Sequence, residues 1–210
     1  MAATRGQRIG IWIIAIFMAV GTIGSFVIII LANQNQKNEQ ARYTQLIEEY
    51  RAEQSEQAKE LSDKYYDTLS PYASRVGTFD AASVTELKTE DLVVGDGEKL
   101  DENSTFTAYY IGWTPDGKIF DQSIEGDSLK APFTVYPGAV IEGWSKGVVG
   151  MKVGGVRELT IPAEQAYGET GNQNIAPNTP LKFVLLVIPT PEPIMPSQEL
   201  LDLDKRLGAQ

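Results

Sequence analysis

The longest hydrophobic segment lies near the start of the chain. No charged residue occurs from Ile9 to Ala32, and a helix over this run would be about 36 Å long, which exceeds the hydrocarbon core of about 30 Å. A cleavable signal peptide would have a shorter apolar region, of about 7 to 15 residues, and small residues at the first and third positions before its cut. The bulky Ile30 occupies the third position before the only suitable cut. The pattern therefore predicts an uncleaved transmembrane helix over residues 9–32.

The basic residues around this segment indicate its orientation. Arg5 and Arg8 precede it, and all 28 acidic residues follow it. Because lysine and arginine are retained on the cytoplasmic side, we expect residues 1–8 to be cytoplasmic and the rest to be exported. No eukaryotic targeting or retention motif is present, so we expect a single-pass protein of a bacterial plasma membrane. Small residues within the segment allow weak self-association.

A helical pattern without glycine or proline follows the hydrophobic segment. Apolar residues recur at intervals of three and four: Tyr43, Leu46, Ile47 and Tyr50, then Leu61, Tyr65 and Leu69. This spacing predicts a helix that ends at Ser70-Pro71, within a stalk and linker over residues 33–83. Gln54 and Gln57 interrupt the stripe, which disfavours a long coiled coil. Packing on the downstream domain, pairing with a second copy and an isolated helix all remain open.

From Val84 onward, turn residues alternate with short β-favouring runs. Residues 105–111, 156–161 and 181–188 have the composition of strands, and glycines bound a short helix near Trp144, over residues 142–149. The pattern predicts an α+β domain over residues 84–188, with a small antiparallel sheet and one short helix.

The remaining segment, residues 189–210, begins with a proline-rich stretch. Four prolines precede Ser197, which is a suitable N-cap for a helix over residues 198–207. Leu200, Leu203 and Leu207 share one face of this helix. That face could dock on the domain or bind a partner.

Composition excludes several classes of chemistry. The 210 residues carry 18 basic and 28 acidic side chains, for a net charge of −10, and this argues against a nucleic-acid partner. Histidine and cysteine are both absent, so a disulfide, a thiol nucleophile, a Ser-His-Asp triad and a Cys/His zinc site are excluded. A site built from carboxylates alone stays open. We expect no cofactor.

Several short motifs occur in a characteristic order. They are Tyr109-Tyr110-Ile111-Gly112, Asp116-Gly117-Lys118-Ile119-Phe120-Asp121-Gln122-Ser123, Val140-Ile141-Glu142-Gly143-Trp144, Leu159-Thr160-Ile161-Pro162, Ala166-Tyr167-Gly168 and the segment from Ile175 to Phe183. Together they resemble the FKBP-type peptidyl-prolyl cis-trans isomerases, over about residues 84–188. The resemblance implies a twisted antiparallel sheet wrapped around one short helix, with the substrate pocket between them.

The resemblance also assigns roles to individual residues. Trp144 would form the pocket floor. Phe120, Val140, Ile141, Ile175 and Phe183 would line its walls. The Tyr167 hydroxyl and the Ile141 N–H would bind substrate carbonyls, and Asp121 would lie at the rim with Tyr110 as its hydrogen-bond partner. Ala131, in place of a wall aromatic, and Asn172, in place of a frequent histidine, depart from the pattern. Without the resemblance, the apolar members of this set would be interpreted as ordinary core residues, Tyr167 as a partner of a loop carbonyl and Asp121 as an exposed turn residue.

These expectations combine into a membrane-anchored prolyl isomerase that assists the folding of exported proteins. Its partners would be proline-containing polypeptides, with a macrolide as a possible ligand. The alternative is a weakly active or inactive binding module that captures clients through its stalk or tail.

Overall fold

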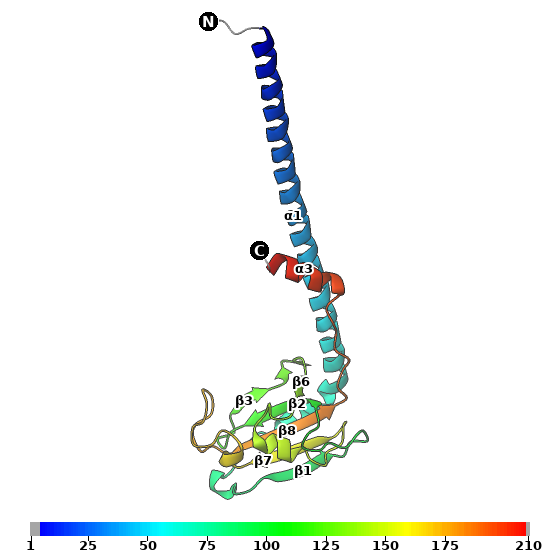
Figure 1. The fold of residues 1–210 in the computed structure, drawn as a ribbon. Helices are drawn as coiled ribbons and strands as arrows, with labels where there is room; N and C mark the ends of the chain where they lie inside the picture. The colour runs from blue at the N-terminus through cyan, green and yellow to red at the C-terminus, as the bar shows by residue number, and fades with distance from the viewer. Residues whose placement is uncertain (1–4, 209–210) are drawn as a thin grey trace. The chain divides into compact units, whose positions relative to one another are not determined.

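The computed structural model describes the backbone of residues 5–208 and the side chains of residues 31–208. Its longest element is the helix α1, Arg5–Leu69 (Figure 1). A 3₁₀ turn, Ser70–Arg75, follows directly and has Pro71 at its start. Proline lacks an N–H and clashes with the preceding helical turn, so the helix ends where the sequence predicted.

The predicted transmembrane segment, residues 9–32, lies almost entirely outside the residues whose side chains are described. The described part of the chain contains no helix with both the length and the hydrophobicity that a bilayer crossing requires.

The sheet is antiparallel throughout, and its strand order is β1-β7-β8-β2-β3 (Figure 1). The short strand β6 pairs with the start of β2, on the same edge of β2 that pairs with β3 further along. Its strands are β1 (Lys88–Val93), β2 (Phe106–Trp113), β3 (Ile119–Gln122), β6 (Phe133–Val135), β7 (Val156–Ile161) and β8 (Leu181–Ile188). A separate hairpin is formed by β4 (Ile124–Glu125) and β5 (Ser128–Leu129). The helix α2 covers Glu142–Gly147, and short 3₁₀ turns cover Ala81–Ser83 and Ala163–Gln165. The α+β fold predicted from the sequence is confirmed.

Both faces of the sheet are covered by apolar layers. Successive side chains of a strand point to opposite faces, so each central strand contributes to both layers. On β2, Ala108 and Tyr110 pack toward α2, whereas Tyr109, Ile111 and Trp113 pack on the opposite face. That opposite face is covered by the end of α1 and by the linker. The residues that cover it are Leu61, Tyr65, Tyr66, Leu69, Tyr72, Val76 and Phe79. The three alternatives for the stalk are thus resolved for its last turns, which pack on the sheet.

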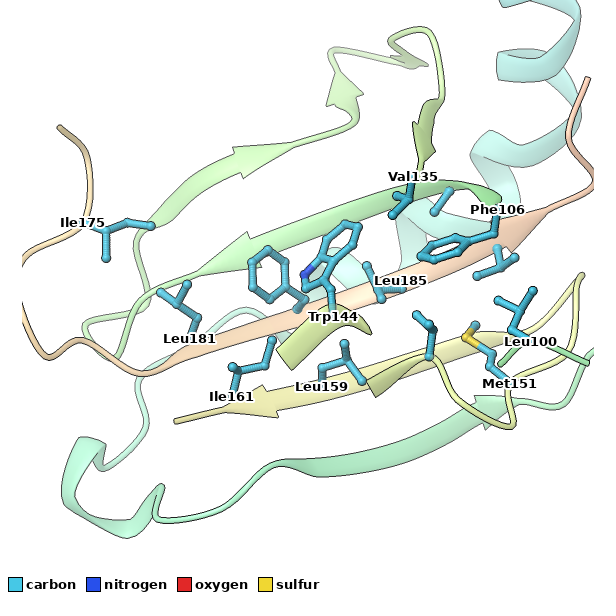
Figure 2. Packing of buried hydrophobic residues seen from close by; sticks show 14 residues of the cluster. Leu100, Phe106, Val135, Trp144, Met151, Leu159, Ile161, Ile175, Leu181 and Leu185 are labelled. Atoms are coloured by element: carbon cyan, nitrogen blue, oxygen red, sulfur yellow. The ribbon is translucent and has the colours of Figure 1, made fainter. Parts of the chain in front are cut away.

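The cluster on the α2 face forms the main core of the domain. Figure 2 shows Trp144 extending from α2 over the sheet, with Leu159 and Ile161 of β7 and Leu185 of β8 around it. Ile175 and Leu181 lie toward one end of this cluster, and Leu100 and Met151 toward the other. The indole therefore lies in the middle of a continuous apolar layer.

The last helix, α3, covers Gln198–Gly208, and the Ser197 hydroxyl accepts a hydrogen bond from the Leu200 N–H at 3.2 Å. This confirms the predicted helix and its N-cap. Leu200 and Leu203 are buried against α1, together with Leu46. Ion pairs Arg42–Glu199 and Arg206–Glu39 border this contact. Leu200 and Leu203 of the predicted leucine face are therefore covered by α1.

The chain divides into two compact units. One comprises Gln54–Pro193 and contains the sheet, and the other comprises the residues up to Glu53 together with those from Ile194 onward. Each unit thus includes its own part of α1.

Candidate functional site

A cavity of about 460 Å³ opens on the α2 side of the sheet. The strands β2, β3, β6 and β8, the helix α2 and the loops around them contribute its lining. The lining residues are Tyr110, Phe120, Asp121, Phe133, Gly138, Ala139, Val140, Ile141, Trp144, Tyr167 and Phe183.

Four aromatic rings form the deep part of this cavity. The Trp144 ring contacts those of Phe183 and Tyr110 edge-on, with centroid distances of 5.2 and 5.3 Å. Phe120 meets Phe183 in the same way, at 5.5 Å. Edge-to-face contacts of this kind are favourable and directional, so the rings hold one another in place. Only 4% of Trp144 is exposed, which is the exposure expected of a pocket floor.

The rim of the cavity carries a hydrogen-bonded pair of side chains. The Tyr110 hydroxyl donates to Asp121 Oδ2 at 2.5 Å, and the Gln122 N–H donates to Asp121 Oδ1 at 2.8 Å. Burial, followed by this bond to Asp121, raises the pKa of the Tyr110 hydroxyl above its ordinary value. Tyr110 is therefore a permanent donor at neutral pH, and Asp121 is held at a fixed position.

Two further donors at the cavity have no partner. The Ile141 N–H and the Tyr167 hydroxyl have no hydrogen-bond acceptor among the described residues. The interpretation of Tyr167 as a partner of a loop carbonyl is therefore wrong. Both groups are available to a carbonyl oxygen of a bound molecule.

The structure brings together the predicted site residues, with one exception. Tyr110, Phe120, Asp121, Val140, Ile141, Trp144, Tyr167 and Phe183 all line the cavity. Ile175 does not line it, because this side chain is 2% exposed and packs in the core near Leu181 (Figure 2). The structure thus assigns Ile175 to packing.

Sequence reasoning missed three lining residues, Phe133, Gly138 and Ala139. Phe133 supplies an aromatic ring to the wall, whereas Ala131 is exposed and lies outside the lining. The signal that could have found Phe133 is its position just before the Val140–Trp144 motif. Asn172, the second departure from the pattern, accepts hydrogen bonds from the N–H groups of Asn174 and Ile175 at 2.8 and 2.9 Å. It organises its own loop.

Within the described part of the chain, no group of three or more His, Cys, Asp or Glu side chains could hold a metal ion. The cavity instead combines an apolar floor with hydrogen-bond donors at its edge, which suits an uncharged ligand with carbonyl groups.

Comparison with known families agrees with this chemistry. A family model described as FKBP-type peptidyl-prolyl cis-trans isomerase matches residues 96–188. The chain contains an FKBP-type isomerase domain. This domain holds every residue that lines the cavity.

Relatives of the FKBP-type domain occur in longer proteins. The chain is 47% identical over 100 residues to FK506-binding protein 4 of Dictyostelium discoideum, a match that covers 46% of this chain and 26% of the relative. It is 42% identical over 99 residues to the 39 kDa FK506-binding nuclear protein of Drosophila melanogaster, covering 46% and 27%. A solved peptidyl-prolyl cis-trans isomerase from Pseudomonas syringae pv. tomato is 30% identical, with 60% of this chain and 93% of that chain covered and a TM-score of 0.44. The chain thus spans about a quarter of the length of these curated relatives.

The matched region excludes both the segment before residue 96 and the tail. Both curated relatives are eukaryotic, so they lend no support to the bacterial origin that we expected. The membrane anchor and the exported location stay predictions.

Proposed function

We propose that the FKBP-type domain of this chain accelerates cis-trans rotation about Xaa-Pro bonds in polypeptide clients. The observation that carries this proposal is the open cavity over Trp144, with apolar rings at its base and the Tyr110–Asp121 pair at its rim. A prolyl ring is apolar and compact, and the flanking carbonyls of its chain need donors. The cavity offers both.

Rotation about the peptide C–N bond has a barrier of about 18–20 kcal/mol, because resonance gives the bond partial double-bond character. Twisting breaks the conjugation and reduces the charge separation of the amide. An apolar aromatic environment therefore disfavours the planar bond more than the twisted one. A thousandfold acceleration requires only about 4 kcal/mol of such a difference, and no proton has to be transferred.

The donors at the edge of the cavity would orient the substrate. We assign one substrate carbonyl to the Ile141 N–H and another to the Tyr167 hydroxyl, since neither donor has an acceptor among the described residues. Asp121, fixed by Tyr110, would face the rotating bond from the rim. The names of the curated relatives describe those proteins as FK506-binding. A macrolide ligand of this chain would occupy the same cavity and compete with the peptide.

The experiment that tests this function uses the full-length chain in detergent. The cis-trans exchange rate of a short Xaa-Pro peptide would be measured by exchange NMR. We expect clear acceleration by the wild type, and a loss of at least tenfold in kcat/KM for Asp121→Leu and for Phe183→Ala. An inactive wild type would overturn the proposal.

Because Phe183 is buried, Phe183→Ala also lowers the stability of the protein. The control variant must therefore be destabilised to a similar extent without altering the cavity. Phe106→Ala removes an equally buried ring from the same core, at a position outside the cavity. We expect it to lower the unfolding midpoint as Phe183→Ala does, and to retain the rate enhancement of the folded protein.

We further propose that residues 9–32 anchor the chain in a membrane, with the domain on the exported side. Support comes from the uncharged run in the sequence and from the helical backbone of α1, which continues through it. Extraction of membranes at alkaline pH should leave the wild type in the pellet, whereas a variant without residues 9–32 should be soluble. Wild-type protein in the soluble fraction would contradict the anchor.

A further inference from the structure

A buried arginine lies beneath the helix that carries the pocket floor. Arg157 is on β7 and is only 6% exposed. Its Nη1 donates to the carbonyl oxygens of Gly147 and Val149, at 2.8 and 3.0 Å. Its Nε and Nη2 donate to the two carboxylate oxygens of Asp91, at 2.6 and 3.0 Å. The guanidinium is thus held from one side and binds backbone on the other.

One carbonyl belongs to Gly147, the last residue of α2, and the other belongs to Val149, two residues after it. The last carbonyls of a helix lack partners within the helix, and they attract a positive charge. This helix has six residues, too few to be stable by itself. Its orientation therefore depends on what it binds at its ends and on its underside.

The underside of α2 also lies very close to β7. A Cβ added at Gly147 would lie 2.8 Å from the side chain of Leu159. Arg157 and this close approach act at the same end of α2. Trp144 lies less than one helical turn before Gly147, so a shift of this end would move the indole against Phe183 and Tyr110.

Asp91 fixes the guanidinium in this position. It lies directly opposite Arg157 in the pairing of β1 with β7, and the bidentate geometry sets the plane of the guanidinium. The guanidinium is buried whereas the Asp91 side chain is 43% exposed, and a charge taken out of water in this way is a poor source of stability compared with an apolar side chain of similar volume. An apolar residue at position 157 could not make the directed hydrogen bonds that Arg157 makes to the two carbonyls.

We propose that Arg157 is a positioning residue for the isomerase site. By holding the carboxyl-terminal end of α2 over β7, it fixes the Trp144 ring at the floor of the cavity, and Asp91 supports it. It makes no contact with the cavity itself. This inference rests on the proposed function, because the effect on catalysis can be measured only if the domain is an active isomerase.

The neighbouring residue on β7 provides a matched control. Glu158 is as buried as Arg157, but it belongs to the opposite face of the sheet. It accepts from Arg75 Nε at 2.5 Å and from Lys182 Nζ at 2.9 Å. Glu158 is the buried member of this ion-pair cluster, whose cations are partly exposed. Removing its charge disrupts the cluster and leaves α2 and its contacts unchanged.

The test compares Arg157→Met, Arg157→Lys, Asp91→Asn and Glu158→Gln in the full-length chain. We expect Arg157→Met to lower kcat/KM for an Xaa-Pro peptide at least tenfold, mainly through kcat. Arg157→Lys should recover part of the loss, because one ammonium can reach one carbonyl. Asp91→Asn should lower kcat/KM about threefold, and Glu158→Gln should lower it less than twofold while lowering the unfolding midpoint to a similar extent.

Hydrogen exchange of the amides of residues 142–149 gives a second readout that does not depend on catalysis. We expect faster exchange there in Arg157→Met, at a temperature at which the strands remain protected, and no change in Glu158→Gln. Unchanged exchange in Arg157→Met, or kcat/KM reduced equally in Glu158→Gln, would overturn the positioning role. If Arg157→Met does not fold, Arg157→Lys and Asp91→Asn decide by the same two measurements. An inactive wild type would overturn the proposed function, and exchange of residues 142–149 would still test the contact.

Discussion

Tyr109 and Tyr110 are neighbours on β2, and their hydroxyls lie in opposite environments. The Tyr110 hydroxyl donates to Asp121 at the cavity rim. The Tyr109 hydroxyl is buried on the other face of the sheet, and it has no hydrogen-bond partner among the described residues. Burial raises the pKa of Tyr109 to about 12, and the nearby Tyr65 adds to this shift. The Tyr110 hydroxyl thus contributes to the site, whereas the unsatisfied Tyr109 hydroxyl lowers the stability of the folded state.

Replacing Tyr109 by phenylalanine should therefore stabilise the protein. An unsatisfied buried hydroxyl costs about 1–3 kcal/mol, so we expect Tyr109→Phe to raise the free energy of unfolding by about 1 kcal/mol at pH 7. Because the pKa is raised in the folded state, the wild type loses stability as the pH rises from about 10 toward 12. The advantage of the variant should widen by about 1 kcal/mol at pH 11. Urea unfolding at both pH values measures this, and a less stable variant at pH 7 would contradict it.

Gly112 allows two pocket rings to approach β2. A Cβ at this position would lie 2.6 Å from Phe183 Cε1 and 2.9 Å from Phe120 Cζ. We expect Gly112→Ala to displace both rings and to lower kcat/KM about ten- to hundredfold, with overpacking costing about 1–3 kcal/mol. Gly77→Ala is the matched control, since nothing lies within 4 Å of its Cβ. Equal activity of the two variants would show that the rings tolerate the methyl group.

The sequence motifs located most of the cavity at the level of single residues, because they record residue types in a fixed order. They failed at Ile175 and Phe133. The same motif residue would be expected whether Ile175 lined the cavity or packed in the core. Only the folded loop, which Asn172 organises, shows that Ile175 packs in the core. Phe133 lies on a strand of three residues, which is too short to show a periodicity.

Among the elements, α1 carries two apolar stripes that contact different partners. Tyr43, Leu46, Ile47 and Tyr50 pack with α3, whereas Leu61, Tyr65 and Leu69 pack on the sheet. The interruption at Gln54 and Gln57 coincides with the boundary between the two compact units, at Glu53 and Gln54. The sequence predicted the helix from its period, but a stripe does not identify what covers it. Strand β1 was missed because most of its side chains are polar and exposed.

The same substitution in the two stripes should have different effects. Leu69 is completely buried under the sheet, so we expect Leu69→Ala to lower the free energy of unfolding of the isomerase domain by about 2–5 kcal/mol. Leu46→Ala should leave that transition unchanged and release α3, because Leu46 packs with Leu200 and Leu203. The first effect is measured by chemical denaturation, with prolyl isomerase activity as the readout. The second is measured by proteolysis within residues 189–196. A lower denaturation midpoint in Leu46→Ala would contradict the assignment of these stripes.

At the scale of the whole molecule, the absence of histidine and cysteine fixes the pH response. Side chains of the remaining types ordinarily titrate near pH 4 or near pH 10 and above, and the pKa of Tyr110 is raised further. We therefore expect kcat/KM to vary less than about twofold from pH 6 to pH 9, and to be unchanged by EDTA. A bell-shaped profile centred near neutrality would indicate proton transfer and contradict a mechanism based on desolvation alone.

The strand order of the sheet has a consequence for the synthesis of this protein. The strand β8 lies between β7 and β2 at the centre of the sheet, yet it is the last strand to leave the ribosome. Until residues 181–188 emerge, Tyr109 and Ile111 of β2 and Val156 of β7 lack their central neighbour and expose apolar surface. Pairings between distant segments form slowly, and nascent chains with exposed strands aggregate. We therefore expect this chain to depend on chaperones late in translation, and chains truncated at Pro180 to remain sensitive to protease over their whole sheet region.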